Sequence, residues 1–475
     1  METLVAGAWG MKYSITNCLR VFLLLLPVFF FTNADGQVLK KIKNSARDIQ
    51  DAARQVTMTT KEVSNAAKTL NQSWKKDTSR NIRYEQVPDY RNREEVSINK
   101  KQKLSVENGQ FKNLSWDAVT KFNSQIFPSF IIGWASYKGV KDEDMGSSLG
   151  FTIRTTLTNI VLKWEIECAD KNYFTIDSGY INCDNIRSTT FFLPRIAWNY
   201  RALTKHQTSA PLNIYFRLID PNSGSKVEKL INVNLRSIND CLTYYNGKSF
   251  QFLFTAFVNE DHPEIDKILK QMLDTKMIDA VLGYQRGPAY VDLQVAALWR
   301  VLHDRGFQYS SITDNSGYNE SKGLFAQTVR TFDNSLKTNQ SNCVDGTVVF
   351  ASVLKRMGIR PILITVPGHC FLGYYADDTT TSNIRFLETT MISGSTFISN
   401  PKASIQKHSD ILAKIIPKGV KLSDINKAYF LEFLTAQATG YNAFKKNMEK
   451  YGAQYVTLLS VNTWRQYVKP IPLYD

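Results

Sequence analysis

The feature that most constrains this chain is residues 327–390, where a cysteine, a histidine and an acid follow one another within clear helix and strand patterns. Apolar residues at helical spacings follow Cys343 as far as Met357, and Gly358 is typical of the residue after a helix C-terminus. Cys343 is therefore expected at a helix N-terminus. Unpaired N–H groups and the helix dipole favour a negative charge there, so a thiol at this position is expected to have a lowered pKa.

Two strands are predicted after this helix. Residues 359–366 form a continuous apolar run that ends at Pro367-Gly368, which indicates a buried central strand. His369 opens the next run, residues 369–375, in which successive side chains face opposite sides of a sheet. If His369 faces the helix N-terminus, Cys370 is therefore predicted to point away from it.

A third short strand, residues 384–389, alternates and carries Glu388. If it pairs antiparallel with the histidine strand, Glu388 can lie beside the imidazole. Asp377, Asp378 and Asn383, from the polar turn before this strand, are alternative groups that could orient the ring.

The arrangement resembles the transglutaminase-like branch of the papain-type cysteine enzymes. The residues that carry the resemblance are S-N-C-V-D-G at 341–346, F-A-S-V-L-K-R-M-G-I-R-P at 350–361, P-G-H-C-F-L-G-Y at 367–374 and F-L-E-T-T at 386–390. The resemblance implies that Cys343 is the nucleophile, His369 the general base and acid, and Glu388 the group that orients the imidazole. Glu388 departs from the family pattern, in which the third member is usually Asp.

Such a site would attack a carboxamide or peptide carbonyl and form a thioester acyl-enzyme, which water or an amine then resolves. Hydrolysis is favoured over transamidation because water is abundant. The oxyanion needs donors, and the candidates are the Cys343 backbone N–H and the side chains of Gln327, Gln340 and Asn342, while Tyr309 could line the cleft. The alternative function is a catalytically inactive module that binds peptide or glycan.

The N-terminus has the pattern of an export signal. Lys12 and Arg20 flank a short polar start, residues 21–31 are apolar apart from Pro27, and residues 32–34 resemble a small-residue cleavage site. This apolar run is too short to span a bilayer about 30 Å thick. Residues 1–34 are therefore predicted to be a cleaved signal peptide that directs the protein to the periplasm, cell envelope or exterior. An uncleaved signal anchor and a start at Met11 are the alternatives.

Export would leave five cysteines, because Cys18 belongs to the predicted signal peptide. An odd number in an oxidising compartment leaves at least one free thiol, which a catalytic cysteine would be. Cys168 and Cys183 flank a predicted strand-turn-strand segment and are a candidate disulfide, or equally two reduced, half-buried residues. The chain has no C-x-x-C pair and five histidines, so neither a metal site nor a cofactor is expected.

Residues 35–110 are predicted to be a helical arm and a charged linker. Apolar residues recur at spacings of three and four up to residue 74, and residues 75–105 are rich in charge. This region holds much of the net charge of +15. In an exported protein it would contact anionic envelope polymers or lipid headgroups rather than nucleic acid, although a solvated surface is the simpler interpretation. It is also a candidate pro-segment.

Residues 111–260 are predicted to be a β-rich accessory domain that positions a substrate or partner. Five runs of β-branched and aromatic residues read as strands, at 148–163, 173–181, 189–193, 212–218 and 229–235. Turn residues occur at 177–179 and 220–224. Several short strands at this spacing predict a β-sandwich.

Residues 261–475 are the predicted catalytic domain. Apolar residues at helical spacings indicate helices at 264–273 and 291–305, and the charged surroundings of His262 and His303 indicate surface positions. Helices and a closing strand are expected after Glu388. The predicted fold class is α+β: a papain-like core of helices on an antiparallel sheet, preceded by a β-sandwich-like unit and the helical arm.

Overall fold

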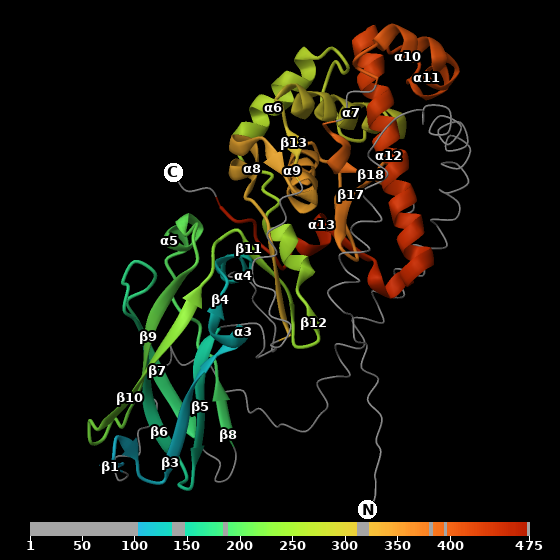
Figure 1. The fold of residues 1–475 in the computed structure, drawn as a ribbon. Coiled ribbons are helices and arrows are strands. Elements are labelled where there is room, and N and C mark those ends of the chain that lie inside the picture. The colour runs from blue at the N-terminus through green and yellow to red at the C-terminus, as the bar shows by residue number, and fades with distance from the viewer. Residues whose placement is uncertain are drawn as a thin grey trace, which may run out of the picture. The chain divides into compact units, whose positions relative to one another are not determined.

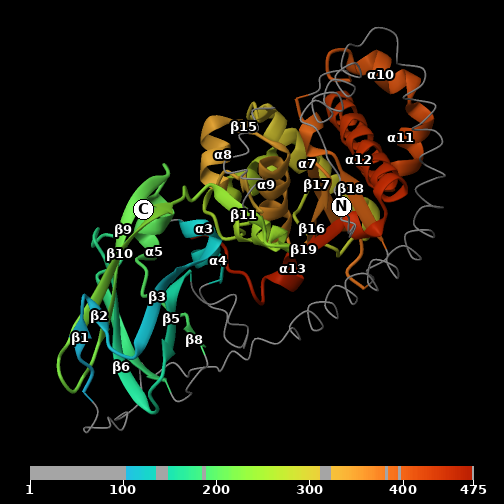
Figure 2. The same ribbon diagram turned by 60° about the horizontal axis from the view of Figure 1, so that its bottom comes forward.

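The computed structural model of the protein describes residues 103–134, 148–183, 189–310, 323–379, 383–393 and 397–472. The described residues contain both helices and several separate sheets, so the predicted α+β class is confirmed at that level (Figures 1 and 2). All of them belong to the larger of the two units into which the chain divides, Ala53–Asp475. The predicted signal peptide and nearly all of the helical arm lie outside the described residues.

The first half of the described chain consists mainly of two β-sheets. One sheet has the order β3-β5-β8, with strands Leu114–Thr120, Leu149–Thr155 and Thr189–Phe192. The other has the order β4-β10-β9-β6-β7, with strands Gln125–Ile126, Lys226–Leu235, Ala210–Ile219, Ile160–Cys168 and Ile176–Cys183. A small hairpin, β1 (Val106–Glu107) and β2 (Gln110–Phe111), precedes them.

The two sheets face each other across an aromatic core. The ring centroid of Phe151 in β5 lies 5.6 Å from that of Phe216 in β9 and 6.4 Å from that of Trp164 in β6. All three side chains are buried, as is the inward half of each alternating strand. Rings at these separations add to the stabilisation from burial, so the two sheets form a sandwich.

Three predictions for this part of the chain are wrong. Residues 148–163 are not one strand but contain β5 and the start of β6, separated by residues 156–159. Asp177, Ser178 and Gly179 do not form a turn but lie within β7, opposite β6. A Cβ on Gly179 would lie 2.9 Å from the Trp164 ring, so glycine is needed there for close packing rather than for a turn.

The candidate disulfide between Cys168 and Cys183 is also wrong, since both are buried cysteines that form no disulfide. Cys183 pairs with Ile160 at one end of β6, whereas Cys168 ends that strand. Eight residues of strand separate the two positions by roughly 27 Å, and a disulfide needs Cα atoms within about 7 Å.

A third sheet links the sandwich sequence to the rest of the chain. Its order is β12-β11-β14, with strands Lys248–Ser249, Asp240–Tyr245 and Leu324–Thr328. It therefore joins strands from both sides of residue 260. The short helices α3 (Lys121–Ser124), α4 (Pro128–Trp134) and α5 (Tyr200–Lys205) and the 3-10 helix η4 (Gln251–Ala256) belong to the same half of the chain.

The helices predicted before the cysteine are present as α6 (Glu264–Asp274) and α7 (Pro288–Asp304), and α8 (Phe332–Thr338) follows them. His303 is partly exposed, but His262 is buried, contrary to its predicted surface position. Its ring lies 4.8 Å from that of Phe332, and burial lowers the pKa of His262. The charged residues near His262 in the sequence therefore did not indicate that its side chain is buried against Phe332.

The second half of the chain is built on a four-stranded antiparallel sheet, with the order β18-β17-β16-β19. The strands are Ile384–Leu387, His369–Tyr375, Pro361–Val366 and Thr457–Ser460, of which the last is the expected closing strand. Helix α9 (Cys343–Arg356) packs on β16 and β17, and the long helix α12 (Asp424–Tyr451) runs along β18 (Figures 1 and 2). Every residue of β16 is buried, as its continuous apolar sequence predicted.

The remaining elements are short. They are β13 (Gln308–Tyr309), β15 (Gln340–Ser341), η6 (Thr389–Met391), α10 (Pro401–Lys407), α11 (Ser409–Ile415), η7 (Ala453–Tyr455) and α13 (Val461–Trp464). No helix within the described ranges is long and apolar enough to cross a bilayer.

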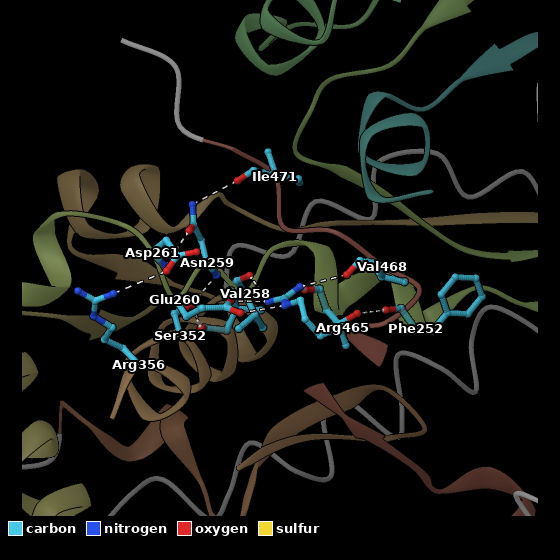
Figure 3. A network of polar contacts seen from close by, with 12 residues as sticks. Phe252, Val258, Asn259, Glu260, Asp261, Ser352, Arg356, Arg465, Val468 and Ile471 are labelled. Carbon is cyan, nitrogen blue, oxygen red and sulfur yellow. Dashed lines mark hydrogen bonds and ion pairs between the residues drawn. The ribbon is translucent and has the colours of Figure 1, made fainter. Parts of the chain in front are cut away.

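The C-terminal segment is fastened behind helix α9 by a polar network (Figure 3). Arg465 donates to both carboxylate oxygens of Glu260, at 3.0 and 2.6 Å, and to three backbone carbonyls. Asn259, the residue before Glu260, donates its backbone N–H to Ser352 Oγ of α9 and its side-chain amide to the Ile471 carbonyl. These contacts tie residues 258–261 and the C-terminal segment to the helix that begins at Cys343.

Candidate active site

Cys343 is the first residue of α9, as predicted. The preceding residue, Asn342, caps the helix: its Oδ1 accepts from the N–H groups of Val344 and Asp345, at 2.9 and 2.8 Å. Asp345 completes the capping box by accepting from the Asn342 N–H at 3.0 Å. The cap uses two of the free N–H groups of the first turn, whereas that of Cys343 has no hydrogen-bond partner among the described residues.

Two further contacts hold the N-terminus of α9 in place. The buried carboxylate of Asp345 accepts from the backbone and the guanidinium of Arg330, each at 2.7 Å. On the other side, a Cβ on Gly346 would lie 3.0 Å from Thr389 Oγ1, so glycine lets the segment after Glu388 approach the helix closely. The N-terminus of the helix that carries Cys343 is thus held by Arg330, which precedes it in the chain, and packed against Thr389, which follows it.

His369 is the first residue of β17, directly after the two-residue turn Pro367-Gly368. Gly368 has φ +74°, as the residue after proline in a type II turn requires. The imidazole is hydrogen-bonded to Glu388 and interacts electrostatically with Cys343, and its side chain is 29% exposed. Cys343 is half-buried, so both reactive side chains remain accessible.

The prediction that Cys370 points away from the Cys343 helix is wrong. Cys370 is buried on the face of the sheet that packs against α9, in the same core cluster as Val344 and Val348 of that helix. The ring of His369 lies 5.8 Å from that of Phe371, on the opposite face. His369 nevertheless interacts with Cys343, from its position as the first residue of β17.

The second partner of the imidazole is Glu388, whose Oε2 lies 2.7 Å from Nε2 of His369. Burial alone would lower the pKa of His369, but its interactions with Cys343 and Glu388 raise it to about 10. The ring is therefore held as an imidazolium at neutral pH.

Glu388 lies one residue beyond β18, not within a strand as predicted. Pairing stops there because the Glu388 N–H donates to the Ala436 carbonyl of α12 at 3.0 Å. The carboxylate caps the turn η6, and Oε1 accepts from the N–H and the hydroxyl of Thr390, at 3.2 and 2.7 Å. Each oxygen thus has its own partner, which fixes the carboxylate against the imidazole. Sequence analysis did not identify Thr390.

The alternative orienting groups lie at the other end of the histidine strand. Asp377 and Asp378 follow Tyr375, and their carbonyls accept from Arg360 at 2.7 and 2.8 Å. Asn383 accepts from Arg385. Six residues of strand separate His369 from Tyr375, about 20 Å, so these three side chains are too far from the imidazole.

The oxyanion candidates differ in what their side chains bind. The side-chain amide of Asn342 is buried, and both of its polar atoms are hydrogen-bonded. Oδ1 caps α9, and Nδ2 donates to the Thr328 carbonyl at 2.9 Å. Gln327 donates to the same carbonyl at 3.1 Å. Gln340 is exposed, opposite Gln308. Tyr309 is half-buried and interacts electrostatically with both Cys343 and Glu388.

Two hollows of the described structure lie elsewhere. One surrounds α5 and includes Tyr173 and His206, and another includes His262 and Asp333. Neither is lined by Cys343, His369 or Glu388. In the part of the chain that the structure describes, no group of three or more His, Cys, Asp or Glu side chains is arranged to hold a metal ion.

Known proteins add no information about this site. No protein-family model matches the chain, and no curated protein sequence matches it.

Proposed function

We propose that the chain is a cysteine-dependent enzyme that cleaves peptide or amide bonds through a thioester on Cys343, in a transglutaminase-like, papain-type core. The observation that carries the proposal is that His369, at the start of a strand, is hydrogen-bonded to Glu388 and interacts electrostatically with Cys343 at a helix N-terminus. Each member occupies the position that its chemistry requires: a capped helix start, an exposed ring edge and a fixed carboxylate.

The proposed reaction begins with the Cys343 thiolate and the His369 imidazolium. The sulfur attacks the carbonyl carbon, a C–S bond forms, and the carbonyl electron pair moves to oxygen. When the C=O bond is restored, the C–N bond breaks and the amine leaves with the proton from His369. Neutral His369 then removes a proton from water, which attacks the thioester and releases Cys343. Hydrolysis is preferred because water needs no acceptor site.

The setting of this activity is also a proposal. Export through the predicted signal peptide would place the enzyme in the periplasm, the envelope or outside the cell. Peptide or protein segments would be its substrates, and the basic arm at 35–110 would contact anionic envelope surfaces.

The test is the rate of iodoacetamide alkylation at each cysteine, measured by mass spectrometry at several pH values in the parent and in His369→Ala. Because the pKa of His369 is about 10, the imidazolium persists through pH 6 to 9. We expect fast alkylation of Cys343 even at pH 6, and its loss in His369→Ala. Cys370 is the internal control, since burial raises its pKa well above the ordinary value and it should stay inert.

Equal Cys343 rates in the two proteins would overturn the proposal. The inactive module that binds peptide or glycan would then be the function to pursue.

A further inference from the structure

The strand that carries Tyr309 lies between the two parts of the candidate site. In β13, Tyr309 pairs in parallel with Ser341 of β15, two residues before Cys343. The Ser310 N–H donates to the Ser341 carbonyl at 2.8 Å, and Ser341 Oγ donates to the Gln308 carbonyl at 3.2 Å. The pairing is therefore held at both ends.

The same strand contacts η6, the turn that Glu388 caps. Tyr309 consequently stands between the N-terminus of the Cys343 helix and the segment that holds Glu388. Its phenol interacts electrostatically with both residues, as expected from this position.

The Tyr309 hydroxyl is an available donor. It forms no hydrogen bond with any described residue, and the carboxylate of Glu388 is already engaged by His369 and Thr390. Burial raises the pKa of Tyr309, and the charges of Cys343 and Glu388 raise it further, so the phenol keeps its proton at neutral pH. The side chains of Asn342 and Gln327, by contrast, already donate to the Thr328 carbonyl.

We propose that the Tyr309 hydroxyl donates a hydrogen bond to the oxyanion that forms when the Cys343 sulfur attacks a carbonyl, together with the free Cys343 N–H. This inference rests on the proposed function. The phenol keeps its proton throughout: it binds the oxygen while the carbonyl electron pair resides there and releases it when the C=O bond is restored. Removing one such donor typically slows the reaction about 100-fold or more.

The test compares two reactions of the same thiol in Tyr309→Phe and in the parent. With p-nitrophenyl acetate, Cys343 attacks a carbonyl, passes through an oxyanion and becomes acetylated as p-nitrophenolate leaves. With iodoacetamide, it displaces iodide from a saturated carbon and no oxyanion forms. Both products are quantified at Cys343 by mass spectrometry, and the exposed Tyr455→Phe is the matched control.

We expect Tyr309→Phe to slow acetylation about 100-fold while alkylation stays at the parent rate, which also shows that the fold is retained. Unchanged rates of both reactions would overturn the role of Tyr309 and leave the proposed function intact. An equal loss in both would overturn it as well, because Tyr309 would then act on the thiol itself. A parent protein in which Cys343 accepts neither reagent would reject the proposed function, and this inference with it.

Discussion

Glu388 Oε2 lies 2.7 Å from His369 Nε2, although Glu388 no longer belongs to the strand that pairs with the histidine strand. Leu372 pairs with Leu387, so continued pairing would have placed Thr390 opposite His369. Instead the chain bends into η6 after Leu387 and turns the longer Glu388 side chain back towards the ring. This bend explains how a glutamate can stand where the resembled family usually has an aspartate.

The bend also makes Thr390 a positioning residue, because its hydroxyl donates to Glu388 Oε1 at 2.7 Å. We expect Thr390→Val to slow acetylation of Cys343 by p-nitrophenyl acetate about tenfold, the usual effect of losing one hydrogen bond to a charged group. Thr390→Ser keeps the hydroxyl and should retain the parent rate.

Urea unfolding of both Thr390 variants separates this effect from a general loss of stability. If Thr390→Ser is as slow as Thr390→Val, the hydroxyl does not position Glu388.

We expect Glu432 of α12 to make the free energy of unfolding depend on pH. It is buried, and neither carboxylate oxygen has a well-formed hydrogen bond to a described residue. Burial raises its pKa to about 8, against the lowering effect of nearby donors on Phe397, Trp299 and Ile398. The folded state therefore keeps a proton that the unfolded state loses near pH 4.5, so the free energy of unfolding falls as pH rises from about 4.5 to about 8.

Glu432→Gln should remove most of this dependence. At pH 8.5 we expect the variant to be more stable than the parent by a few kcal/mol, on the order of what its pKa shift represents, and at pH 4 nearly equal to it. Urea unfolding at both pH values measures the difference. Glu449→Gln, at an exposed position of the same helix, is the control. A constant difference at both pH values would contradict an ionisation effect.

The ion pair of Arg465 in the network of Figure 3 is expected to contribute strongly to the free energy of unfolding. Its side chain is 15% exposed and that of Glu260 is 17% exposed, so Arg465→Met would leave a largely buried carboxylate unpaired. We expect a loss of about 3 kcal/mol in the free energy of unfolding. Measurement by urea denaturation is sufficient.

Arg356 provides the matched control, because it pairs with Asp261 in the same network but its side chain is 42% exposed. Arg356→Met should cost less than about 1 kcal/mol. The double variant Arg465→Met with Glu260→Gln should recover part of the loss; no recovery would mean that the charge pair is not the cause.

The start of α9, the buried strand after it and the strand that begins at His369 could be predicted because their signals are local. Asn342 and Asp345 form a capping box, Gly358 ends the helix with φ +79°, and Pro367-Gly368 makes a hairpin turn. Each follows from backbone chemistry within a few residues. The same stretch therefore indicated both the elements and the order of the reactive side chains.

Other predictions failed because they depend on contacts between distant segments. Alternation along a strand could not show that His369 interacts with Cys343 while Cys370 packs on the α9 side of the sheet. Sequence distance could not show that Cys168 and Cys183 lie at opposite ends of one strand pair. His262 stands among charged residues in sequence and is buried by Phe332 in space.

The sequence by itself determined a capped helix beginning at Cys343 and a histidine at the start of the second strand after it, since caps, turns and apolar runs act over a few residues. Only the tertiary structure decided which acid meets His369 and which donor is brought to Cys343. Glu388 reaches the ring because Ala436 of a distant helix takes its backbone N–H, and Tyr309 reaches the cysteine helix through pairing with Ser341. Both depend on packing between segments far apart in the chain, which no local pattern records.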